Sequence, residues 1–489
     1  MEGGSVHQAL RVQQGLPVYA PPSAEFIPFL YTPLYPALLA LLGAVFPLGL
    51  ALGRVVSVAA FAAACAGAWW IVGREGKPRA HQLAAVGLMC AGFVFTYRFY
   101  DVARADTLML ALIVWGLGLW RHADARPGRA ALAGLLLALA FWTKQTAALF
   151  ILAAGVAGLY LVFRAARRRR ALLALATLVL VIAAIDGGGA LVGARATGGW
   201  LWNYIYELHQ THAFNHERFT EKSWGMLLHA APLVVALLAL RGGAALTSVA
   251  RAARARRWPV AADGAVFWGI IAAAALLASA LGYSTQWAEA NAFMPAVWFG
   301  AVFVAVLLPV GRGEPLALAL VGLQLGFSLL VEPRYQPIQR DGARAGLSES
   351  YAWQDPWRTI PTPAQRRRAA SLRAELSAGP PVFALHHPMW PLLAGGDGHV
   401  GAMGIHDVPP EHRARVEAAV REQLDRVAYP VLWFEGPPPA WLRGVVRRRY
   451  RLERRVRGDD RVRPMTGFMS DAGMVTPYRR EQLRYVPRS

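Results

Sequence analysis

Four charged side chains fall within the ten-residue stretch 98–107, which lies between two apolar runs. They are Arg98, Asp101, Arg104 and Asp106. Charged groups at a membrane boundary are costly unless they pair, meet water or take part in chemistry. Carboxylates here could act as general bases or bind a metal, and arginines could bind an anion. The alternative is an ordinary loop whose arginines reach lipid headgroups, so the rest of the sequence has to decide.

The position of Asp106 also has two interpretations. It begins an apolar run that we expect to be a helix, and Asp101 lies in the tight connection before it, so both carboxylates can face one aqueous pocket. A carboxylate in the first turn of a helix is also favourable for structural reasons, because it meets the positive end of the helix dipole. We favour a functional role because two arginines and two tyrosines crowd the same stretch.

A lone lysine, Lys144, occupies the polar turn 143–146 between two further apolar runs. An ammonium group in such a hairpin can bind an anion, and a phosphate is its natural partner. The alternative is a lysine that simply extends toward water. The predicted position of the turn, on the same side of the membrane as 98–107, favours the phosphate-binding role.

Three further polar residues are candidates for the same site. Glu289 and Asn291 open a helix with a carboxylate and an amide, which suit sugar hydroxyls, although Asn291 could equally serve as a helix N-cap. Glu2 could be a general base or a metal ligand if the N-terminal segment folds over the pocket. A carboxylate so near the end of a chain is more often solvated.

Histidines in two segments could bind a metal ion. His209, His212 and His216 have the i, i+3, i+7 spacing of one helical stripe, on which neighbouring pairs could hold a divalent ion. We favour instead an interfacial segment anchored by Trp200 and Trp202. The histidines of the tail lack familiar ligand spacing; they are His386, His387, His399 and His406. The sequence thus predicts no certain cofactor and leaves a divalent metal ion as an open alternative.

Composition places the chain among polytopic membrane proteins. Of its 489 residues 55% are hydrophobic, and they come in blocks. The formal net charge is +21, but the arginines cluster between apolar blocks and in the tail, which indicates membrane topology rather than nucleic-acid binding. Cys65 and Cys90 lie inside apolar runs, so neither a disulfide framework nor a thiolate metal site is expected.

Ten apolar segments are candidate membrane spans. They cover approximately 54–72, 82–98, 104–120, 130–142, 146–163, 171–192, 224–240, 265–281, 293–310 and 315–331. Arginine-rich connections alternate with arginine-poor ones, and the positive-inside rule places the arginine-rich ones in the cytoplasm. The connections that contain 98–104, Lys144 and Glu289 then face the exterior, together with both ends of the chain.

The two ends differ from this core. The N-terminal segment has no signal-peptide pattern, and the apolar stretch 33–46 is too short to cross, so we expect it to lie in the membrane interface. The tail is polar, and it predicts helices at 362–377 and 410–427 and strands at 381–385 and 431–434. We therefore expect an exterior loop with an interfacial helix (1–48), a transmembrane core (49–331) and an exterior soluble α/β domain (332–489).

These residues resemble the GT-C membrane glycosyltransferases, in particular bacterial relatives of protein O-mannosyltransferases and of the transferases that attach aminoarabinose to lipid A. The resemblance covers approximately residues 2–331. It rests on the order of five motifs: Glu2-Gly-Gly, Thr32-Pro-Leu-Tyr-Pro36, Arg104-Ala-Asp106, Thr143-Lys-Gln-Thr146 and Asn291 to Pro295. Family members normally begin with a spanning helix before the first acidic motif, so this chain resembles a member that lacks its first transmembrane helix.

The resemblance implies a fold and an activity. The fold would be a polytopic α-helical core of the GT-C type with a small soluble α/β domain. The activity would be transfer of a sugar from a polyprenyl-phosphate donor to an acceptor, in a bacterial inner (plasma) membrane and on its exterior side. Glu2, Asp101 and Asp106 would be the catalytic carboxylates. The substrate-binding residues would be Arg98, Arg104, Lys144, Gln145, Glu289 and Asn291.

Two other classes remain alternatives at this point. A transporter or flippase of lipid-linked saccharides could also need outward-facing charge, but we find none of the inverted repeats with broken helices that would support it. A membrane-anchored scaffold with a partner-binding tail is the third possibility.

Overall fold

The computed structural model describes residues 2–254, 261–286, 288–330, 360–457, 461–462 and 481–488. The chain forms two compact units. One consists of Met1–Arg54, Val192–Thr211 and Asp355–Ser489, and the other of Val55–Leu191 and His212–Gln354. Trp287 and residues 331–359, where the last predicted span ends, lie outside the described residues.

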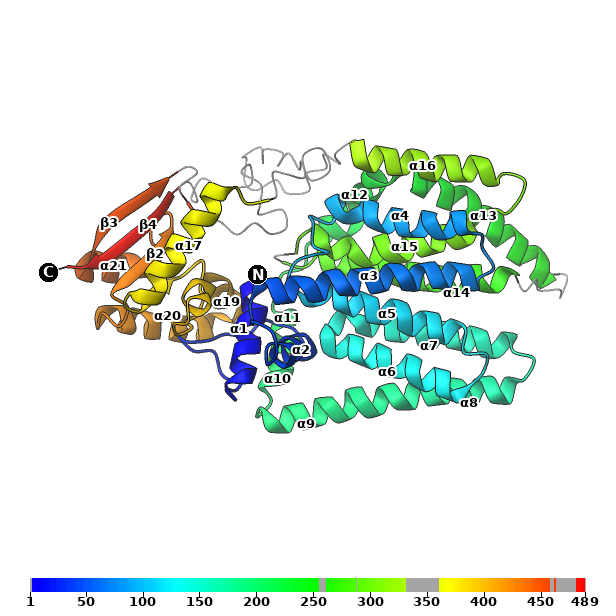
Figure 1. Ribbon diagram of the computed structural model, residues 1–489. Helices are drawn as coiled ribbons and strands as arrows, with labels where there is room; N and C mark the ends of the chain where they lie inside the picture. Colours follow the sequence, from blue (N-terminus) through cyan, green and yellow to red (C-terminus); the bar gives the residue numbers. More distant parts are fainter. Residues whose placement is uncertain are drawn as a thin grey trace. The chain divides into compact units, whose positions relative to one another are not determined.

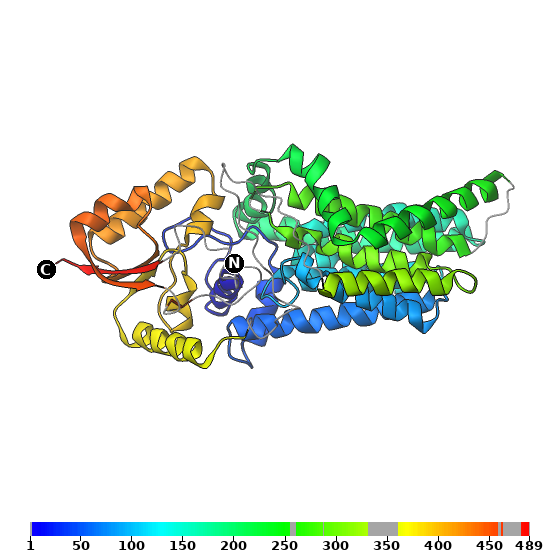
Figure 2. The same cartoon turned by 90° about the horizontal axis from the view of Figure 1, so that it is seen from above.

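The second unit is a helical bundle (Figures 1 and 2). Its main helices are α3 (Leu50–Arg74), α4 (Arg79–Phe95), α5 (Ala105–Arg121), α6 (Pro127–Thr143), α7 (Ala148–Arg164), α8 (Arg168–Ile182), α9 (Gly188–Ala196), α12 (Ser223–Ala230), α13 (Pro232–Arg254), α14 (Ala261–Tyr283), α15 (Met294–Leu307) and α16 (Glu314–Leu330). Shorter turns connect or interrupt them: η1 (Gln145–Ala147), η2 (Ala183–Gly187), η4 (Arg218–Lys222) and η5 (Ala290–Phe293). The ends of α3 and α9 continue into the first unit.

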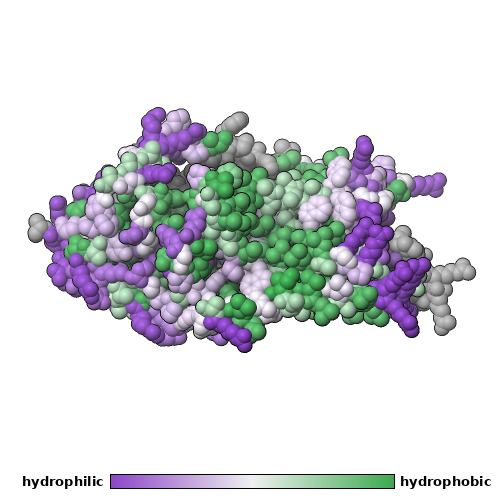
Figure 3. Space-filling model, turned by 60° about the horizontal axis from the view of Figure 1, so that its bottom comes forward, coloured by the Kyte–Doolittle hydropathy of each residue, from purple (hydrophilic) through white to green (hydrophobic). Residues whose placement is uncertain are grey.

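Several of these helices can cross a membrane. Among the described residues, five helical segments are long and apolar enough, and a sixth is a bent pair formed by α12 and α13. Each of the ten predicted spans coincides with a helix or helix pair of the bundle. Four of them, α4, α5, α6 and α16, have 17 residues each, slightly short of the roughly 20 needed for an untilted crossing. Apolar side chains cover the middle of the visible side of the bundle and hydrophilic ones gather at its far end (Figure 3), as expected for a surface that meets lipid. The chain is therefore a multi-pass α-helical membrane protein, as the sequence predicts.

A buried ionic cluster ties three helices together at one end of the bundle. The side chain of Glu75, just beyond α3, is 7% exposed and pairs with Arg121 at the end of α5. Its Oε1 also accepts a hydrogen bond of 2.9 Å from Trp268 of α14. Gly264 makes this approach possible, because a Cβ there would lie 2.3 Å from a carboxylate oxygen of Glu75. The cluster fixes α5, whose opposite end begins with Ala105 and Asp106.

The first unit combines the N-terminal segment, residues 192–211 and the tail. Its N-terminal helices are α1 (Glu2–Gln13) and α2 (Leu34–Leu42), and the middle segment forms α10 (Trp200–Trp202), η3 (Asn203–Glu207) and α11 (Leu208–Gln210). Tyr204 donates a hydrogen bond to the carbonyl of Ala20, and a ring nitrogen of His209 lies 2.8 Å from the carbonyl oxygen of Leu30. These contacts join the middle segment to the N-terminal one.

The tail forms a small α/β domain. Its sheet has the order β1-β2-β4-β3, with β1 (Val382–Ala384) parallel to β2 (Val431–Glu435), and β4 (Glu481–Pro487) antiparallel to β2 and to β3 (Tyr450–Arg457). The helices are α17 (Pro363–Ala378), α18 (Met389–Leu393), α19 (Ala402–Asp407), α20 (Pro410–Asp425) and α21 (Ala440–Arg449). Phe383, Leu432 and Val420 are fully buried between sheet and helices. The predicted fold class, a helical membrane core with a small α/β domain, is thus confirmed.

One sequence-based alternative is corrected here. His209, His212 and His216 do not share a helical stripe, because α11 ends at Gln210 and residues 212–215 are not helical. The turn at His212 breaks the spacing on which a pairwise metal site would depend.

Candidate active site

The connection between α4 and α5 has an unusual backbone. Tyr97 and Arg98 both adopt left-handed conformations, with φ of 56° and 60°. Such conformations are uncommon for residues other than glycine and are held in place by surrounding structure, often at functional sites. The amide of Arg98 donates a 2.8 Å hydrogen bond to the carbonyl of Phe93, which closes the end of α4. The side chain of Arg98 is 5% exposed.

Three hydrogen bonds fix the rest of this connection. The hydroxyl of Tyr100 donates to the carbonyl of Met89, and Thr107 donates back to the carbonyl of Tyr100. From α3, Ser57 donates to the carbonyl of Val102 at 2.7 Å. The Tyr100 ring packs against Phe61 and Trp298. The charged stretch is therefore a rigid part of the bundle, and Asp101 is half-buried within it.

Asp106 lies between two cations. Arg104 is extended at the residue before α5, and its Nε lies 3.1 Å from Oδ2 of Asp106. The Nζ of Lys144 lies 2.6 Å from Oδ1. Both carboxylate oxygens are thus engaged, and Asp106 and Arg104 are 5% and 8% exposed. The first turn of α5 adds the positive end of its dipole to the same place.

The backbone around Lys144 presents its side chain to α5. Helix α6 ends at Thr143, Lys144 is extended with φ of −160°, and the turn η1 follows. The amide of Lys144 donates to the carbonyl of Ala140, and its own carbonyl accepts from Ala147. The structure therefore brings together Arg104, Asp106 and Lys144, which the sequence grouped from separate segments. Gln145 is next in the chain and half-buried.

The cluster brings two cations to one carboxylate in a largely buried position. The guanidinium of Arg104 also lies 5.3 Å above the ring of Phe99, which stabilises a cation there. Guanidinium and ammonium groups both bind phosphate, so the cluster contains the side chains that an anionic ligand requires.

The loop before α15 lies beside the same connection. The ring of Tyr97 packs against a buried cluster that includes Ala290 and Phe293 of η5. Tyr97 lies beyond the end of α4, near enough to Glu289 and Arg218 for their charges to act on its phenol. Glu289 and Asn291 are both half-buried on either side of Ala290. The predicted sugar-binding loop thus neighbours the 98–107 stretch.

Arg218 was not indicated by the sequence. Its guanidinium donates to the carbonyls of Tyr283 and Ala288 at 3.2 Å each and lies 4.9 Å above the Tyr283 ring. It therefore fixes the loop that carries Glu289. The only signal in the sequence was its place in a polar connection with the other candidate residues.

Glu2 belongs to the first unit and makes a two-pronged ion pair. Its Oε1 and Oε2 each lie 2.9 Å from a nitrogen of Arg54, Nε and Nη2 respectively. Glu2 is only 5% exposed, so it is not the solvated carboxylate that its place near the end of the chain would favour. The Arg54 side chain is 32% exposed. Arg54, at the beginning of α3, was treated in the sequence only as the edge of a span.

The described residues contain no group of three or more histidine, cysteine, aspartate or glutamate side chains arranged to hold a metal ion. Both oxygens of Asp106 already accept hydrogen bonds from cations. The cluster is suited to holding an anion, and no step of the chemistry below depends on a metal.

The sequence profile of Glycosyltransferase family 87 matches residues 29–281, which is more than half of the chain. The chain belongs to this glycosyltransferase family. The matched region includes Arg98, Asp101, Arg104, Asp106, Lys144 and Arg218. This match confirms the resemblance to glycosyltransferases inferred from the sequence and identifies the family as family 87.

Solved structures of ArnT from Cupriavidus metallidurans are similar to this family 87 chain. The apo structure has a TM-score of 0.49 and 16% identity over 88% of this chain and 76% of that one. The structure of the same protein bound to undecaprenyl phosphate has a TM-score of 0.46 and 15% identity, with the same coverage. No curated protein matches the sequence significantly.

Proposed function

We propose that this family 87 glycosyltransferase takes its sugar from a polyprenyl-phosphate donor and transfers it to an acceptor on the exterior face of a bacterial inner membrane. The observation that supports the donor class is the position of Arg104 and Lys144, two side chains of phosphate-binding type, on either side of Asp106. The cluster lies at the beginning of a predicted spanning helix, where a membrane lipid can bring a phosphate to it.

The reaction assigns different roles to these groups. A carboxylate removes the proton of the acceptor hydroxyl, the oxygen bonds to the anomeric carbon, and the bond from that carbon to the phosphate oxygen breaks. The phosphodiester carries one negative charge, and the departing polyprenyl phosphate carries two. Arg104 and Lys144 stabilise this added charge, so they bind the transition state more strongly than the donor.

Within the bundle, Asp106 positions the two cations and Asp101 is the proton acceptor. Both oxygens of Asp106 accept bonds from Arg104 and Lys144. Asp101 is half-buried in the same rigid connection, where an acceptor can reach it from solvent. Glu2 stays a predicted catalytic carboxylate of the N-terminal segment.

The experiment uses the full chain in proteoliposomes with radiolabelled polyprenyl-phosphate sugars, and it measures label that leaves the lipid. The wild type should transfer label, and Lys144→Met should transfer at least 100-fold more slowly. Lys222→Met is the matched control, because that lysine pairs instead with the exposed Glu217. Full transfer by Lys144→Met would contradict the role of the cluster, and transfer from a nucleotide sugar instead would contradict the donor class.

A further inference from the structure

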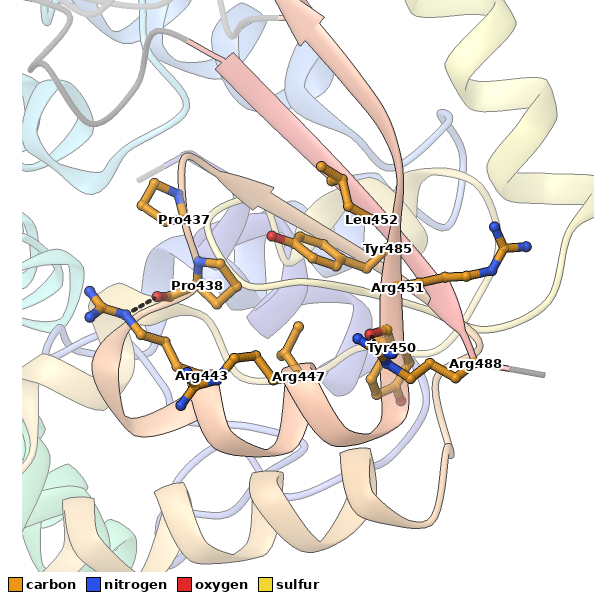
Figure 4. A pocket seen from close by; sticks show the side chains of 10 residues that line it. Pro437, Pro438, Arg443, Arg447, Tyr450, Arg451, Leu452, Tyr485 and Arg488 are labelled. Atoms are coloured by element: carbon orange, nitrogen blue, oxygen red, sulfur yellow. Dashed lines mark hydrogen bonds between the residues drawn. The ribbon is translucent and has the colours of Figure 1, made fainter.

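A cavity in the soluble α/β domain is lined by four arginines. It has a volume of about 330 Å³ and lies between α21 and the strands β3 and β4 (Figure 4). The arginines are Arg443 and Arg447 of α21, Arg451 of β3 and Arg488 after β4. Among the described residues, no acidic side chain lines the cavity. Its volume is at the lower end of the range of small-molecule sites, which suits a phosphate or a small sugar phosphate.

These arginines differ from the other arginines of the same sheet and helix. Arg448 and Arg449, also on α21, both pair with Asp425. On the strands, Arg454 and Arg484 pair with Glu375, and Arg455 and Arg457 pair with Glu481. Among the described residues, the four arginines of the cavity form no ion pair. Within this helix and sheet, the arginines outside the cavity therefore pair with carboxylates, whereas those around the cavity do not.

The local structure concentrates the positive charge. Arg443 and Arg447 are four residues apart on α21 and lie on the same face of the helix, where like charges repel. Two of the four guanidinium groups are held by backbone carbonyls, since Arg443 donates to Pro438 and Arg488 donates to Tyr450. Arg447 and Arg451 form no hydrogen bond through their side chains with the described residues. An anion would relieve the repulsion between Arg443 and Arg447 and use the unoccupied donors of Arg447.

The apolar part of the lining narrows the class of ligand. The ring of Tyr485 lies across the space above α21, with Pro437 and Pro438 at one end (Figure 4). A guanidinium group binds phosphate through two parallel hydrogen bonds, and several such groups favour a ligand with at least two negative charges. The tyrosine and proline surfaces can contact the organic part to which the phosphate is attached.

From these observations we propose that the cavity is a binding site for a phosphate monoester or diphosphate. The ligand is either a soluble phosphorylated compound or the headgroup of an anionic lipid, and both present the same phosphate chemistry. The site is separate from the cluster of Asp106 and Lys144 and does not depend on the proposed transfer reaction.

The test measures binding of inorganic pyrophosphate and of a hexose 1-phosphate to the full chain in neutral detergent by calorimetry. Arg447→Gln/Arg451→Gln should weaken binding by at least about tenfold, because it removes two guanidinium groups without breaking a described hydrogen bond. Arg448→Gln/Arg449→Gln removes the same charge from the other face of α21 and should change affinity by less than about threefold. Equal effects of the two double variants, or no effect of either, would overturn the proposal.

Two further arms identify the source of the phosphate and exclude the membrane cluster. Nanodiscs that contain phosphatidic acid, a phosphate monoester, test the lipid source against nanodiscs of phosphatidylcholine alone. Preferential binding of the phosphatidic acid nanodiscs, with the same difference between variants and no binding of the soluble anions, assigns the site to a lipid headgroup. Binding of the soluble anions assigns it to a soluble phosphate. Lys144→Met should leave pyrophosphate binding unchanged, and loss of binding in this variant alone would overturn the assignment to the cavity.

Discussion

The Nζ of Lys144 lies 2.6 Å from Oδ1 of Asp106, although the two residues are 38 positions apart in the chain. The contact joins the beginning of α5 to the turn between α6 and α7. Arg104 approaches the other carboxylate oxygen, so one carboxylate separates two cations. The stability of this arrangement and its chemistry should therefore respond differently to loss of the carboxylate and loss of a cation.

Asp106→Asn should destabilise the protein more than Lys144→Met. The first change leaves two neighbouring cations without an anion between them and should cost about 3–5 kcal/mol. The second leaves an Arg104–Asp106 pair that is neutral overall and should cost less. Thermal unfolding of the two variants and of the double variant in detergent measures the coupling between the residues, which we expect to be about 1–3 kcal/mol. Additive effects would contradict a direct pairing.

Asp101 and Asp106 should differ in their kinetic effects. Asp101→Asn removes the proposed proton acceptor and should lower kcat by about 10²–10⁴-fold with little change in the KM for the donor. Asp106→Asn misplaces Arg104 and Lys144 and should also raise that KM. Steady-state transfer rates over a range of donor concentrations separate the two. An Asp101→Asn variant with an unchanged kcat would refute the assignment of the base.

Glu2 and Arg54 provide a test of the N-terminal carboxylate. If their ion pair is only structural, Glu2→Gln and Arg54→Gln should lower stability by similar amounts and both variants should keep activity. We expect a loss of about 1 kcal/mol, because the side chain of Arg54 is one-third exposed. The resemblance predicts instead that Glu2→Gln abolishes transfer while Arg54→Gln retains part of it. Melting temperature and transfer rate of the two variants, measured together, decide between these outcomes.

The sequence predicted helices and strands better than it predicted contacts between distant residues. Uninterrupted apolar runs are a strong signal, so all ten spans coincide with helices, and the clear patterns around Val382 and Val431 predicted two strands correctly. Strand β3 was missed because its run Tyr450–Arg457 is rich in arginine, and those arginines become acceptable only through partners such as Glu375 and Glu481. Local sequence carries no information about such distant partners.

For the candidate site too, the sequence identified some residues and missed others whose role depends on distant contacts. Arg104 and Asp106 are neighbours in sequence, and a charged pair beside an apolar run identified them. Lys144 was selected because it is a lone lysine in a polar turn between two apolar runs, and its predicted place on the same face agrees with the observed contact. Arg54 and Arg218 were missed, since one lies at the edge of a span and the other in a polar segment. Only the fold shows that they hold Glu2 and the loop of Glu289.

The cluster at the other end of the bundle should matter for stability. Glu75→Gln leaves Arg121 largely buried without its charged partner and should cost about 3 kcal/mol or more. Asp124→Asn is a suitable control, because Asp124 is 56% exposed and its pair with Arg129 should contribute less than about 1 kcal/mol. Unfolding in detergent reports both values. Similar small losses in the two variants would show that Glu75 does not fix the helices.

Acid should weaken the soluble domain through a buried histidine. His399 is 1% exposed, its Nε2 accepts a hydrogen bond from the amide of Ala384, and its Nδ1–H donates to the carbonyl of Val400. This arrangement requires a neutral ring. Burial, partly opposed by the bond to Val400, lowers its pKa from 6.5 to about 4. The neighbouring His7 behaves similarly, since burial and then the charge of Arg11 lower its pKa to about 4.

The sign of the pH effect follows from these values. Between pH 6.5 and about 4 the unfolded chain binds a proton at His399 that the folded domain does not, so stability is complete above pH 6.5 and decreases as the pH falls toward 4. The loss attributable to His399 amounts to about 3 kcal/mol at most. Hydrogen exchange of β1 and β2 in the full chain, corrected for intrinsic rates, should therefore accelerate between pH 7 and pH 5. His399→Gln should reduce this dependence, leaving the part due to His7, whereas an unchanged pH dependence would show that His399 does not cause it.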